Sequence, residues 1–404
     1  MHLTIVRPLK HRDFRLLFIG QSVSLLGNQL YFVALPFQIL ALHGSPLQLG
    51  TGFAIFSGAQ LLTVLFGGAL VDRLHRRNVV LAVDLISAVV VGFVAALGLA
   101  HRLEIPYLYA LSAFFGATFS FYQPAMSAIM PELIPSDVLV PGNALLGLSR
   151  RTGSIIGPVL GGVIVSTAGP PWAFAVDAFS FAFSFAVFFF STPPRREAAP
   201  RKHLLAEIRD GVTFTFSVTW IWVAIIGFAL SNGFYFAGFT VALPLLVLKV
   251  LMGNAATYGL IGASAGVGEL VGGLIVGSIH VRRVGVGIYM CSGLLGLAFA
   301  AYGIAPKLPV VLIAAFAFAM MIVVANTLWE ATMQSQVPGH LIGRVSSVDE
   351  FGSFLIGPVA PVLSAVAITQ IGPGPIFIIG GLISFAIWMV ALALVRQVRE
   401  LRVP

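Results

Sequence analysis

Long apolar stretches recur along the whole chain, separated by short segments that are polar or rich in proline and glycine. Each stretch is apolar on every face, whereas the strands of a membrane barrel alternate polar with apolar residues. A helix of about 20 such residues crosses the hydrocarbon core of a membrane. The pattern therefore predicts an all-α membrane protein with twelve transmembrane helices. The predicted spans lie near 16–42, 47–71, 78–100, 105–130, 142–167, 172–192, 216–248, 255–280, 285–305, 309–336, 346–370 and 376–395.

The longest polar segment lies at the middle of the chain. Residues 193–215 are rich in proline and charge, which is typical of a linker followed by a helix on the membrane surface. We therefore expect a six-helix bundle over 1–192, a cytoplasmic linker with an amphipathic helix over 193–215, and a second six-helix bundle over 216–404. With 58% hydrophobic residues, the chain is far more apolar than an ordinary soluble domain.

The basic residues test this map, because Lys and Arg accumulate in cytoplasmic loops. With the N-terminus inside, all but three of the 23 Lys and Arg residues fall on the cytoplasmic side; the exceptions are Arg102, Lys249 and Lys307. Both termini are thus predicted to be cytoplasmic. The net charge of +8 reflects this orientation, so we expect membrane lipids and not nucleic acid as partners.

The sequence also repeats itself weakly. The segment "GGALVDRLHRR" at 67–77 has an echo in "GGLIVGSIHVRR" at 272–283, and "IIGPV" at 155–159 matches "LIGPV" at 355–359. Each pair falls at equivalent places in the two predicted bundles, giving two pseudo-symmetric halves. Such internal repeats are typical of secondary transporters.

These features together resemble the major facilitator superfamily, in particular its macrolide-efflux and enterobactin-exporter branch. The resemblance rests on the two halves, on G-x-L-x-D-R-x-x-R-R after the second span, and on "QPAMSAIMPELIP" and "ALLGLSRRTGSIIGPVLGG". It implies a secondary transporter of the bacterial inner membrane that exports a small amphiphilic molecule, a drug-like compound or siderophore, by alternating access. Protons are the implied coupling ion, and we expect a monomer. An importer or a carrier of lipid-like substrates with the same fold is the alternative.

By this resemblance, the loop after the second span is a gate between the two bundles. The residues assigned to this gate are Gly68, Asp72, Arg73, Arg76 and Arg77, with Asp84 farther along in the third span. The carboxylate of Asp72 can pair with an arginine or lie at a helix N-terminus. The arginines can reach lipid phosphates, backbone carbonyls or Asp84 in the third span. The alternative is an ordinary cytoplasmic loop whose bases only orient the protein.

Glycines recur around a proline in the fifth predicted span. The set comprises Gly153, Gly157, Pro158, Gly161 and Gly162. Glycines four residues apart make a flat stripe that lets another helix approach closely, and the proline bends the span. Simple helix packing would explain the stripe. The resemblance adds that it matches the core of the family's antiporter motif, with Ala144 in place of the upstream glycine.

The resemblance places the substrate cavity between the first, fourth, seventh and tenth spans. Amides and aromatic rings alternate at helical spacing in these spans, which fits a broad, weakly polar pocket. The predicted lining residues are Asn28, Gln29, Tyr31, Phe119, Tyr122, Gln123, Asn232, Tyr235, Asn326 and Trp329. Any one of them could equally face lipid or join two helices. Their recurrence on four equivalent spans favours a pocket.

Acidic residues inside a membrane are costly and mark functional sites. Glu269 is the acid expected nearest the middle of a span, and it is the first candidate for carrying a proton. Glu330 and Asp177 are the next candidates, although Asp177 could be a polar helix start. The acids at 349–350 are expected to pair with Arg344 nearby. The fourth span lacks the family's proton-relay arginine, so proton coupling is less secure than export.

No nucleophile triad, metal-ligand spacing or phosphate-binding glycine loop occurs in the sequence. A membrane enzyme or scaffold would need a catalytic cluster or a large soluble domain. We therefore expect no enzyme activity, no metal and no cofactor, with a small molecule and protons as the transported partners.

Overall fold

The computed structural model describes residues 4–71, 75–192, 204–279, 281–304 and 307–402. These residues form helices and turns and contain no strand. Within this part of the chain, nine helices are long and apolar enough to cross a membrane, and shorter apolar helices occur over Ile105–Phe119 and Ala360–Ile371. The all-α membrane fold is therefore confirmed, and helices occupy each of the twelve predicted spans.

The chain divides into two compact units. The first is Met1–Pro200 with Gly253–Ala263, and the second is Arg201–Met252 with Ser264–Pro404. The division falls within the predicted linker. It also assigns Gly253–Ala263, at the beginning of the predicted eighth span, to the first unit.

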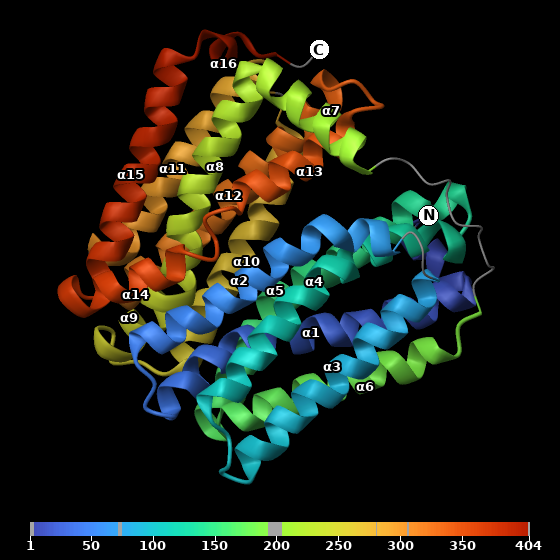
Figure 1. The fold of residues 1–404 in the computed structure, drawn as a ribbon, viewed down its shortest axis with the longest axis vertical. Coiled ribbons are helices and arrows are strands. Elements are labelled where there is room, and N and C mark those ends of the chain that lie inside the picture. The colour runs from blue at the N-terminus through green and yellow to red at the C-terminus, as the bar shows by residue number, and fades with distance from the viewer. Residues whose placement is uncertain (1–3, 72–74, 193–203, 280, 305–306, 403–404) are drawn as a thin grey trace. The chain divides into compact units, whose positions relative to one another are not determined.

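The first unit contains six long helices, which run from blue to green in Figure 1. They are α1 (Arg12–Ala41), α2 (Pro46–Val71), α3 (Arg76–Leu99), α4 (Ile105–Leu133), α5 (Leu139–Thr167) and α6 (Pro170–Phe189). Helix α1 packs against α5 and α6, α3 packs against α4 and α6, and α2 packs against α4. A buried cluster that includes Phe14, Leu17, Val80, Ile129 and Phe188 joins α1, α3, α4 and α6.

The second unit begins with α7, the predicted amphipathic helix of the linker. Its helices are α7 (Leu204–Ser217), α8 (Thr219–Ala237), α9 (Leu243–Lys249), α10 (Ala255–Ser278, the part from Ser264), α11 (Val284–Ile304), α12 (Leu308–Gln336), α13 (Ile342–Ser353), α14 (Ala360–Ile371), α15 (Pro373–Leu394) and α16 (Arg396–Glu400). Three buried tryptophans, Trp220, Trp329 and Trp388, lie in one core cluster of this unit. Helix α11 packs along α12 and α15.

The last long helix of each half begins in the same way. Gly169 precedes Pro170 of α6 with φ 94°, and Gly372 precedes Pro373 of α15 with φ 79°. A side chain is strained at these angles, so glycine is required there. Proline suits the first helical position, because its missing N–H has no partner in a first turn. The repeat seen in the sequence therefore extends to how these helices start.

Two predicted spans are interrupted. A turn of π-helix over Gly238–Ala242 joins α8 to α9 within the seventh span. The eleventh span breaks into α13 and α14, with turns over residues 354–359 between them. Pro358 lies in this break and has no backbone N–H to donate to the Phe354 carbonyl, so a regular helix cannot continue through the segment. The break frees backbone carbonyls that need other donors.

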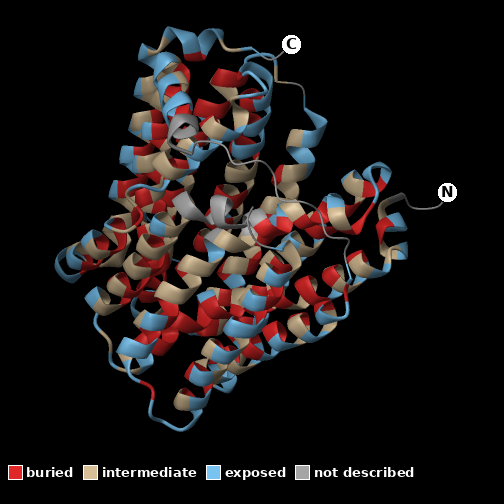
Figure 2. Ribbon diagram, turned by 45° about the vertical axis from the view of Figure 1, so that its right-hand side comes forward, coloured by how far each residue is buried: buried red, intermediate tan, exposed pale blue. Residues whose placement is uncertain are grey.

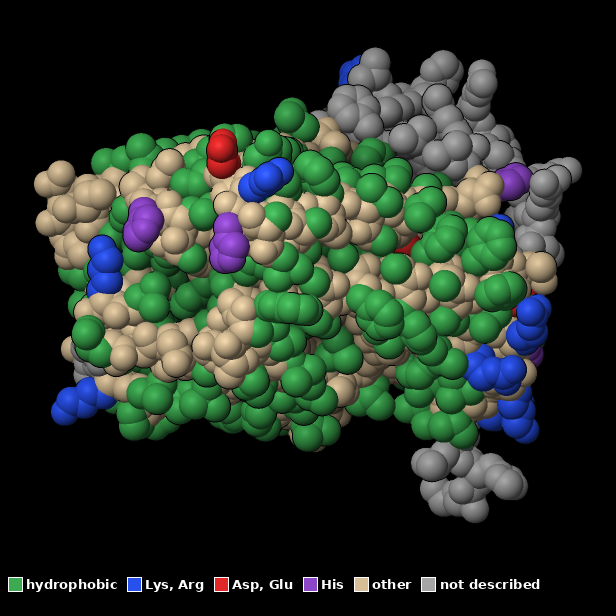
Figure 3. Space-filling model, turned by 90° about the horizontal axis from the view of Figure 1, so that it is seen from below, with side chains coloured by type: hydrophobic (Ala, Val, Ile, Leu, Met, Phe, Trp, Pro, Cys, Tyr) green, Lys and Arg blue, Asp and Glu red, His purple; other side chains and the backbone are tan. Residues whose placement is uncertain are grey.

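Buried residues form stripes along the helices in Figure 2, with less buried residues between them. Leu62, Leu274 and Leu394 are 70%, 75% and 76% exposed, although leucine prefers an apolar environment. In Figure 3 hydrophobic side chains cover most of the face shown, and most charged side chains lie toward its two ends. This distribution is that of a multi-pass membrane protein, whose exposed apolar residues meet lipid.

Candidate functional site

The first unit encloses a cavity of about 170 Å³. Asn28, Gln29 and Tyr31 of α1 line it, as do Phe119 and Tyr122 of α4. All five were predicted to line a substrate pocket, and the structure brings them together. The side chain of Gln123, also predicted, lies outside the described part of the chain. No charged residue is among the described residues that line this cavity.

Aromatic rings form much of the wall of this first cavity. The ring centroid of Tyr31 lies 4.2 Å from that of Phe115 and 5.2 Å from that of Phe32. The Tyr31 hydroxyl lies 3.4 Å from the Ser112 hydroxyl, which is a long hydrogen bond. The cavity is therefore small, uncharged and largely apolar.

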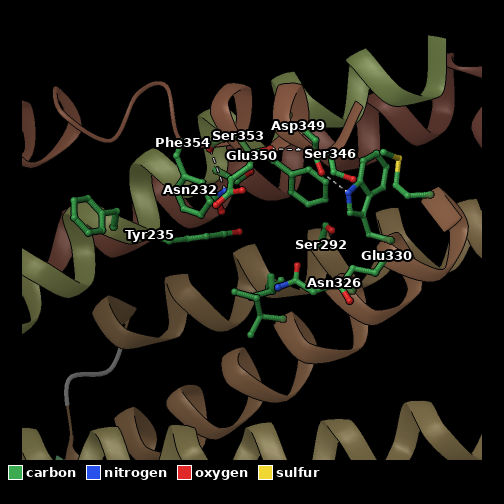
Figure 4. Close-up of a pocket in the computed structure, with 18 of the residues that line it drawn as sticks. Asn232, Tyr235, Ser292, Asn326, Glu330, Ser346, Asp349, Glu350, Ser353 and Phe354 are labelled. Carbon is green, nitrogen blue, oxygen red and sulfur yellow. Dashed lines mark hydrogen bonds between the residues drawn. The ribbon is translucent and has the colours of Figure 1, made fainter. Parts of the chain in front are cut away.

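The second unit contains a larger cavity of about 830 Å³. The remaining predicted residues, Asn232, Tyr235, Asn326 and Trp329, all line it. Glu330, predicted as a proton carrier, lines it as well. In Figure 4 the side chains of Asn232, Tyr235, Asn326 and Glu330 surround one opening together with Ser292 of α11 and residues of α13.

Helical periodicity explains why these side chains meet. On α8, Phe228, Asn232 and Tyr235 line the cavity at spacings of four and three residues, and Phe239 of the adjoining π-helical turn continues the series. On α12, Asn326, Glu330 and Met333 do so, and on α13 Ser346, Asp349, Glu350 and Ser353. Residues three and four apart share one face of a helix. Each helix thus turns one polar and aromatic face toward the same space.

Hydrogen bonds order the wall near α13. The Asp349 carboxylate accepts hydrogen bonds from Trp329 Nε1 at 2.7 Å and from Ser353 Oγ at 3.0 Å. Asn232 Nδ2 donates to the Ser353 carbonyl at 3.2 Å. This carbonyl lies at the end of α13, where the break before Pro358 leaves the helix without its next N–H donors. Asn232 therefore satisfies a group that the broken span exposes.

A second network lies behind the aromatic wall. The hydroxyls of Tyr235 and Ser384 are 2.5 Å apart, and Ser384 Oγ donates to Ser231 Oγ at 2.8 Å. Trp388 Nε1 also donates to Ser231 Oγ, at 3.0 Å. Ser292, which is only 2% exposed, lines the cavity, and its hydroxyl has no hydrogen-bond partner among the described residues.

Two acids are buried more deeply than expected. Asp84 and Asp177 are both 0% exposed. Asp177 lies about two turns inside α6, which begins at Pro170, and is not a polar helix start. The structure buries Glu269 only partly, in α10. The sequence indicated both aspartates, Asp84 beside the gate and Asp177 as a proton carrier, but it could not show how deeply the surrounding helices bury them.

The partners of the two buried aspartates differ. Asp84 Oδ2 accepts hydrogen bonds from Ser184 Oγ at 2.7 Å and, at 3.5 Å, from Gln21 Nε2. Gln21 Nε2 also donates to Ser184 Oγ at 3.1 Å, so the three residues join α1, α3 and α6. Neither carboxylate oxygen of Asp177 has a hydrogen-bond partner among the described residues. An unpartnered buried carboxyl group is far less costly when protonated.

Arg76 and Arg77 are the first two residues of α3, and they connect its first turn to α4 and α6. Arg76 forms an ion pair with Glu132 near the end of α4. Arg77 Nη2 donates to the Phe189 carbonyl at 2.6 Å, at the end of α6, and its guanidinium lies 5.9 Å from the centre of the Phe189 ring. A cation suits a helix C-terminus. Neither of these arginines serves as the partner of Asp84.

Other predicted residues of this loop and its surroundings have different positions. Gly68 lies in α2, while Asp72 and Arg73 lie outside the described residues. Arg344 Nη1 pairs with Asp210 Oδ2 of α7 at 2.6 Å, whereas Asp349 bonds to Trp329 and Ser353. The expected local pairing of the acids at 349–350 with Arg344 is therefore corrected.

The glycine stripe of α5 faces α1. A Cβ atom at Gly157 would lie 2.4 Å from Gln29 Cβ, and one at Gly161 would lie 3.2 Å from Val33 Cβ. A Cβ atom at Gly153 would lie 3.8 Å from the Leu25 carbonyl oxygen, which is an ordinary contact. On the other side, a Cβ atom at Gly162 would lie 2.5 Å from the Ala255 carbonyl oxygen, in the part of α10 that belongs to this unit.

Pro158 of the same motif packs against α10. A Cβ atom at Gly259 would lie 2.2 Å from the Pro158 carbonyl oxygen, and one at Gly262 would lie 2.7 Å from Pro158 Cβ. The motif is thus a place of close helix approach on two sides. Sequence periodicity predicted the close packing, but it did not identify the partner residues.

Comparison with known families agrees with this architecture. The model of the Major Facilitator Superfamily matches residues 17–359. The chain is 27% identical over 410 residues to the Enterobactin exporter EntS of Citrobacter koseri, with 96% of this chain and 94% of that protein covered. It is 26% identical to the protein of the same name from Escherichia coli O1:K1 / APEC, with 92% and 91% covered.

Solved structures with the same fold have lower sequence identity. One is a POT family transporter in complex with 5-aminolevulinic acid, with a TM-score of 0.76, 12% identity and 96% of each chain covered. Another is a bacterial homolog of the human lysosomal transporter Spinster, with a TM-score of 0.68, 15% identity, and 98% of this chain and 96% of that chain covered. At these identities, the likeness is one of fold.

Proposed function

Because the chain belongs to the Major Facilitator Superfamily and is therefore a membrane transporter, we propose that it exports a small amphiphilic molecule in exchange for protons. The substrate is a drug-like compound or a siderophore, and the membrane is the bacterial inner membrane, with both termini in the cytoplasm. The name of the curated relatives, enterobactin exporter, supports export and the siderophore class.

The observation that carries the proposal is the presence of a polar and aromatic cavity in each unit, lined by equivalent helices. Tyr31 of the first helix and Tyr235 of the seventh predicted span occupy related places in the two halves, and each lines its own cavity. Alternating access requires substrate-binding surfaces on both repeats, so that the site opens to one side and then to the other.

Proton coupling is proposed to use carboxyl groups inside the membrane. Asp177 is the first candidate, because its carboxyl group is completely buried and bonded to no described residue. Burial without a partner favours the neutral acid, which can release its proton when the surroundings change. Glu269 and Glu330 remain in the proposed set, Glu330 because it lines the larger cavity.

The loop between α2 and α3 is proposed to be the cytoplasmic latch of this cycle, with Gly68, Asp72, Arg73, Arg76 and Arg77 as its residues. Arg76 and Arg77 fix the first turn of α3 to α4 and α6 within the first unit, which gives the loop a firm base for this role. The glycine stripe around Pro158 is proposed to be the antiporter element.

Flux measurements in proteoliposomes test the proposal. Purified protein is reconstituted, a pH gradient is imposed, and the accumulation of labelled enterobactin and of ethidium is followed. We expect the gradient to drive accumulation that empty liposomes do not show. Asp177→Asn keeps the shape of the side chain but removes the titratable proton, so it should bind substrate and lose gradient-driven accumulation. Unchanged accumulation by this variant excludes Asp177 as the coupling site.

A further inference from the structure

Three carboxyl side chains, those of Glu330, Asp349 and Glu350, line the larger cavity. They come from α12 and α13, and Figure 4 shows Asp349 and Glu350 on one side of the opening with Glu330 on the other. No Lys, Arg or His is among the described residues that line it. The cavity therefore has three acidic side chains in its wall and no basic one among the described residues.

No basic side chain among the described residues pairs with these acids. Asp349 accepts two hydrogen bonds, from Trp329 Nε1 and Ser353 Oγ. Glu330 and Glu350 form no ion pair among the described residues. The nearest basic residue along α13, Arg344, pairs with Asp210 on α7 and does not line the cavity. A cleft walled by one sign of charge concentrates ligands of the opposite sign.

A second observation points independently to a ligand. Ser292 of α11 is only 2% exposed, and its hydroxyl oxygen has no hydrogen-bond partner among the described residues. It lines the same cavity and lies between the acidic groups of the two walls in Figure 4. Buried hydroxyls are normally paired, so an unpaired one facing a cavity is available to a polar group of a ligand.

The remaining wall is aromatic. Trp329, Phe228 and Tyr235 line the cavity, and the Phe228 ring centroid lies 5.3 Å from that of Trp329. Aromatic faces attract organic cations through the negative charge of the ring face, and they bury apolar groups at the same time. Carboxylates and aromatic rings together therefore select a ligand that is both cationic and apolar.

We propose that this cavity binds an amphiphilic organic cation, a protonated amine attached to apolar or aromatic groups. The positive charge lies between Glu330 and Glu350, an N–H group donates to Ser292 Oγ, and the apolar part contacts the rings. This inference rests on the proposed transport function, because it specifies the substrate class of that same protein.

Two probes of nearly equal size and opposite charge provide the test. Binding of tetraphenylphosphonium and of tetraphenylborate to the purified full-length protein is measured by equilibrium dialysis, with partitioning into empty micelles subtracted. We expect saturable binding of the cation only. Glu330→Gln and Glu350→Gln should each weaken it by roughly tenfold, because each removes one attracting charge. Equal binding of the anion, or full affinity in both variants, overturns the proposal.

Matched variants separate loss of charge from loss of folding. Glu330→Asp keeps the charge and should retain most of the binding, whereas Glu400→Gln removes an exposed charge of α16 outside this cavity and should change nothing. Ser292→Ala should weaken the binding of dibenzylammonium several-fold, since this probe has N–H donors, and leave tetraphenylphosphonium unaffected. The thermal midpoint of each variant establishes that it is folded.

The binding and flux assays fail separately. Selective binding of tetraphenylphosphonium without gradient-driven flux would contradict the transport proposal and leave the cation site intact. Gradient-driven flux of ethidium or enterobactin without charge-selective binding would support the transport proposal and contradict the cation site.

Discussion

The cavity of the first unit measures about 170 Å³ and has no charged residue among the described residues that line it, whereas that of the second measures about 830 Å³ and is lined by three carboxyl groups. Both are built from aromatic and amide side chains on repeat-related helices. The first unit also has two fully buried acids, Asp84 and Asp177, but neither lines its cavity. The two halves therefore share a framework and differ in where they place negative charge.

This difference separates two uses of an acidic residue in a membrane. Inside a helix contact, a carboxyl group interacts with hydroxyls and amides or remains neutral, so its effect is on stability and on proton binding. On a cavity wall it is solvated when the site is empty and available to a ligand. We expect mutations at the two kinds of position to affect different measurements.

The largest expected contrast is between Asp84 and Glu350. Asp84→Ala removes the acceptor used by Ser184 and Gln21 and leaves a void in a fully buried place, so it should lower the free energy of unfolding by about 3 kcal/mol. Glu350→Ala breaks no hydrogen bond or ion pair among the described residues and should change stability by less than about 0.5 kcal/mol. Thermal unfolding in detergent measures both.

Asp84→Asn provides the control for this pair. The amide oxygen of Asn can still accept a hydrogen bond from Ser184. The free energy of unfolding should therefore fall less in this variant than in the alanine variant. A stability loss at Glu350 equal to that at Asp84 would remove the distinction between the two kinds of acid.

The helices followed from the apolar pattern and the placement of charge, whereas the cavity residues were chosen by the resemblance to a transporter family together with helical spacing. The nine predicted cavity residues whose side chains are described sort into two cavities, because periodicity on one helix determines which side chains share a face. The break in the eleventh span at Pro358 was not predicted, although the proline was visible, because an apolar run hides a local interruption. The sequence shows the proline, but it does not show that Asn232 of another helix donates a hydrogen bond to the Ser353 carbonyl beside the break.

Partners across helices could not be predicted from one sequence. The ion pair of Arg76 with Glu132 and the contacts of Asp84 with Gln21 and Ser184 join residues far apart in the chain. Local periodicity indicates that a residue faces inward, not which residue it meets. Asp84 was one of three possible partners named for the loop arginines, and its contacts with Gln21 of α1 and Ser184 of α6 could not be read from the sequence.

The next contrast concerns the packing of α5 against α1 beside the first cavity. Gln29 lines that cavity, and Gly157 of α5 lies directly behind it. Gly157→Ala would place a methyl group 2.4 Å from Gln29 Cβ, so we expect a loss of about 2 kcal/mol from overpacking. Gly147→Ala, on the same helix, meets nothing within 4 Å and should be neutral or slightly stabilising. Similar unfolding midpoints for the two variants would show that α5 and α1 are not packed closely enough for an added methyl group to destabilise the protein.

The smallest expected contrast is between the equivalent tyrosines of the two cavities. Tyr235 has its hydroxyl 2.5 Å from Ser384 Oγ, within a network that continues to Ser231, whereas the Tyr31 hydroxyl is 3.4 Å from Ser112 Oγ. A short bond in a connected network contributes more than a long isolated one, so Tyr235→Phe should cost about 1 kcal/mol of unfolding free energy. Tyr31→Phe keeps the ring and its contact with Phe115, and we expect a change below about 0.5 kcal/mol. Both substitutions retain the aromatic wall, so their difference in thermal midpoint reports the hydroxyl alone. If Tyr31→Phe lowers the thermal midpoint more than Tyr235→Phe does, the first cavity depends on its polar contacts as strongly as the second. The two cavities would then differ only in their acidic residues.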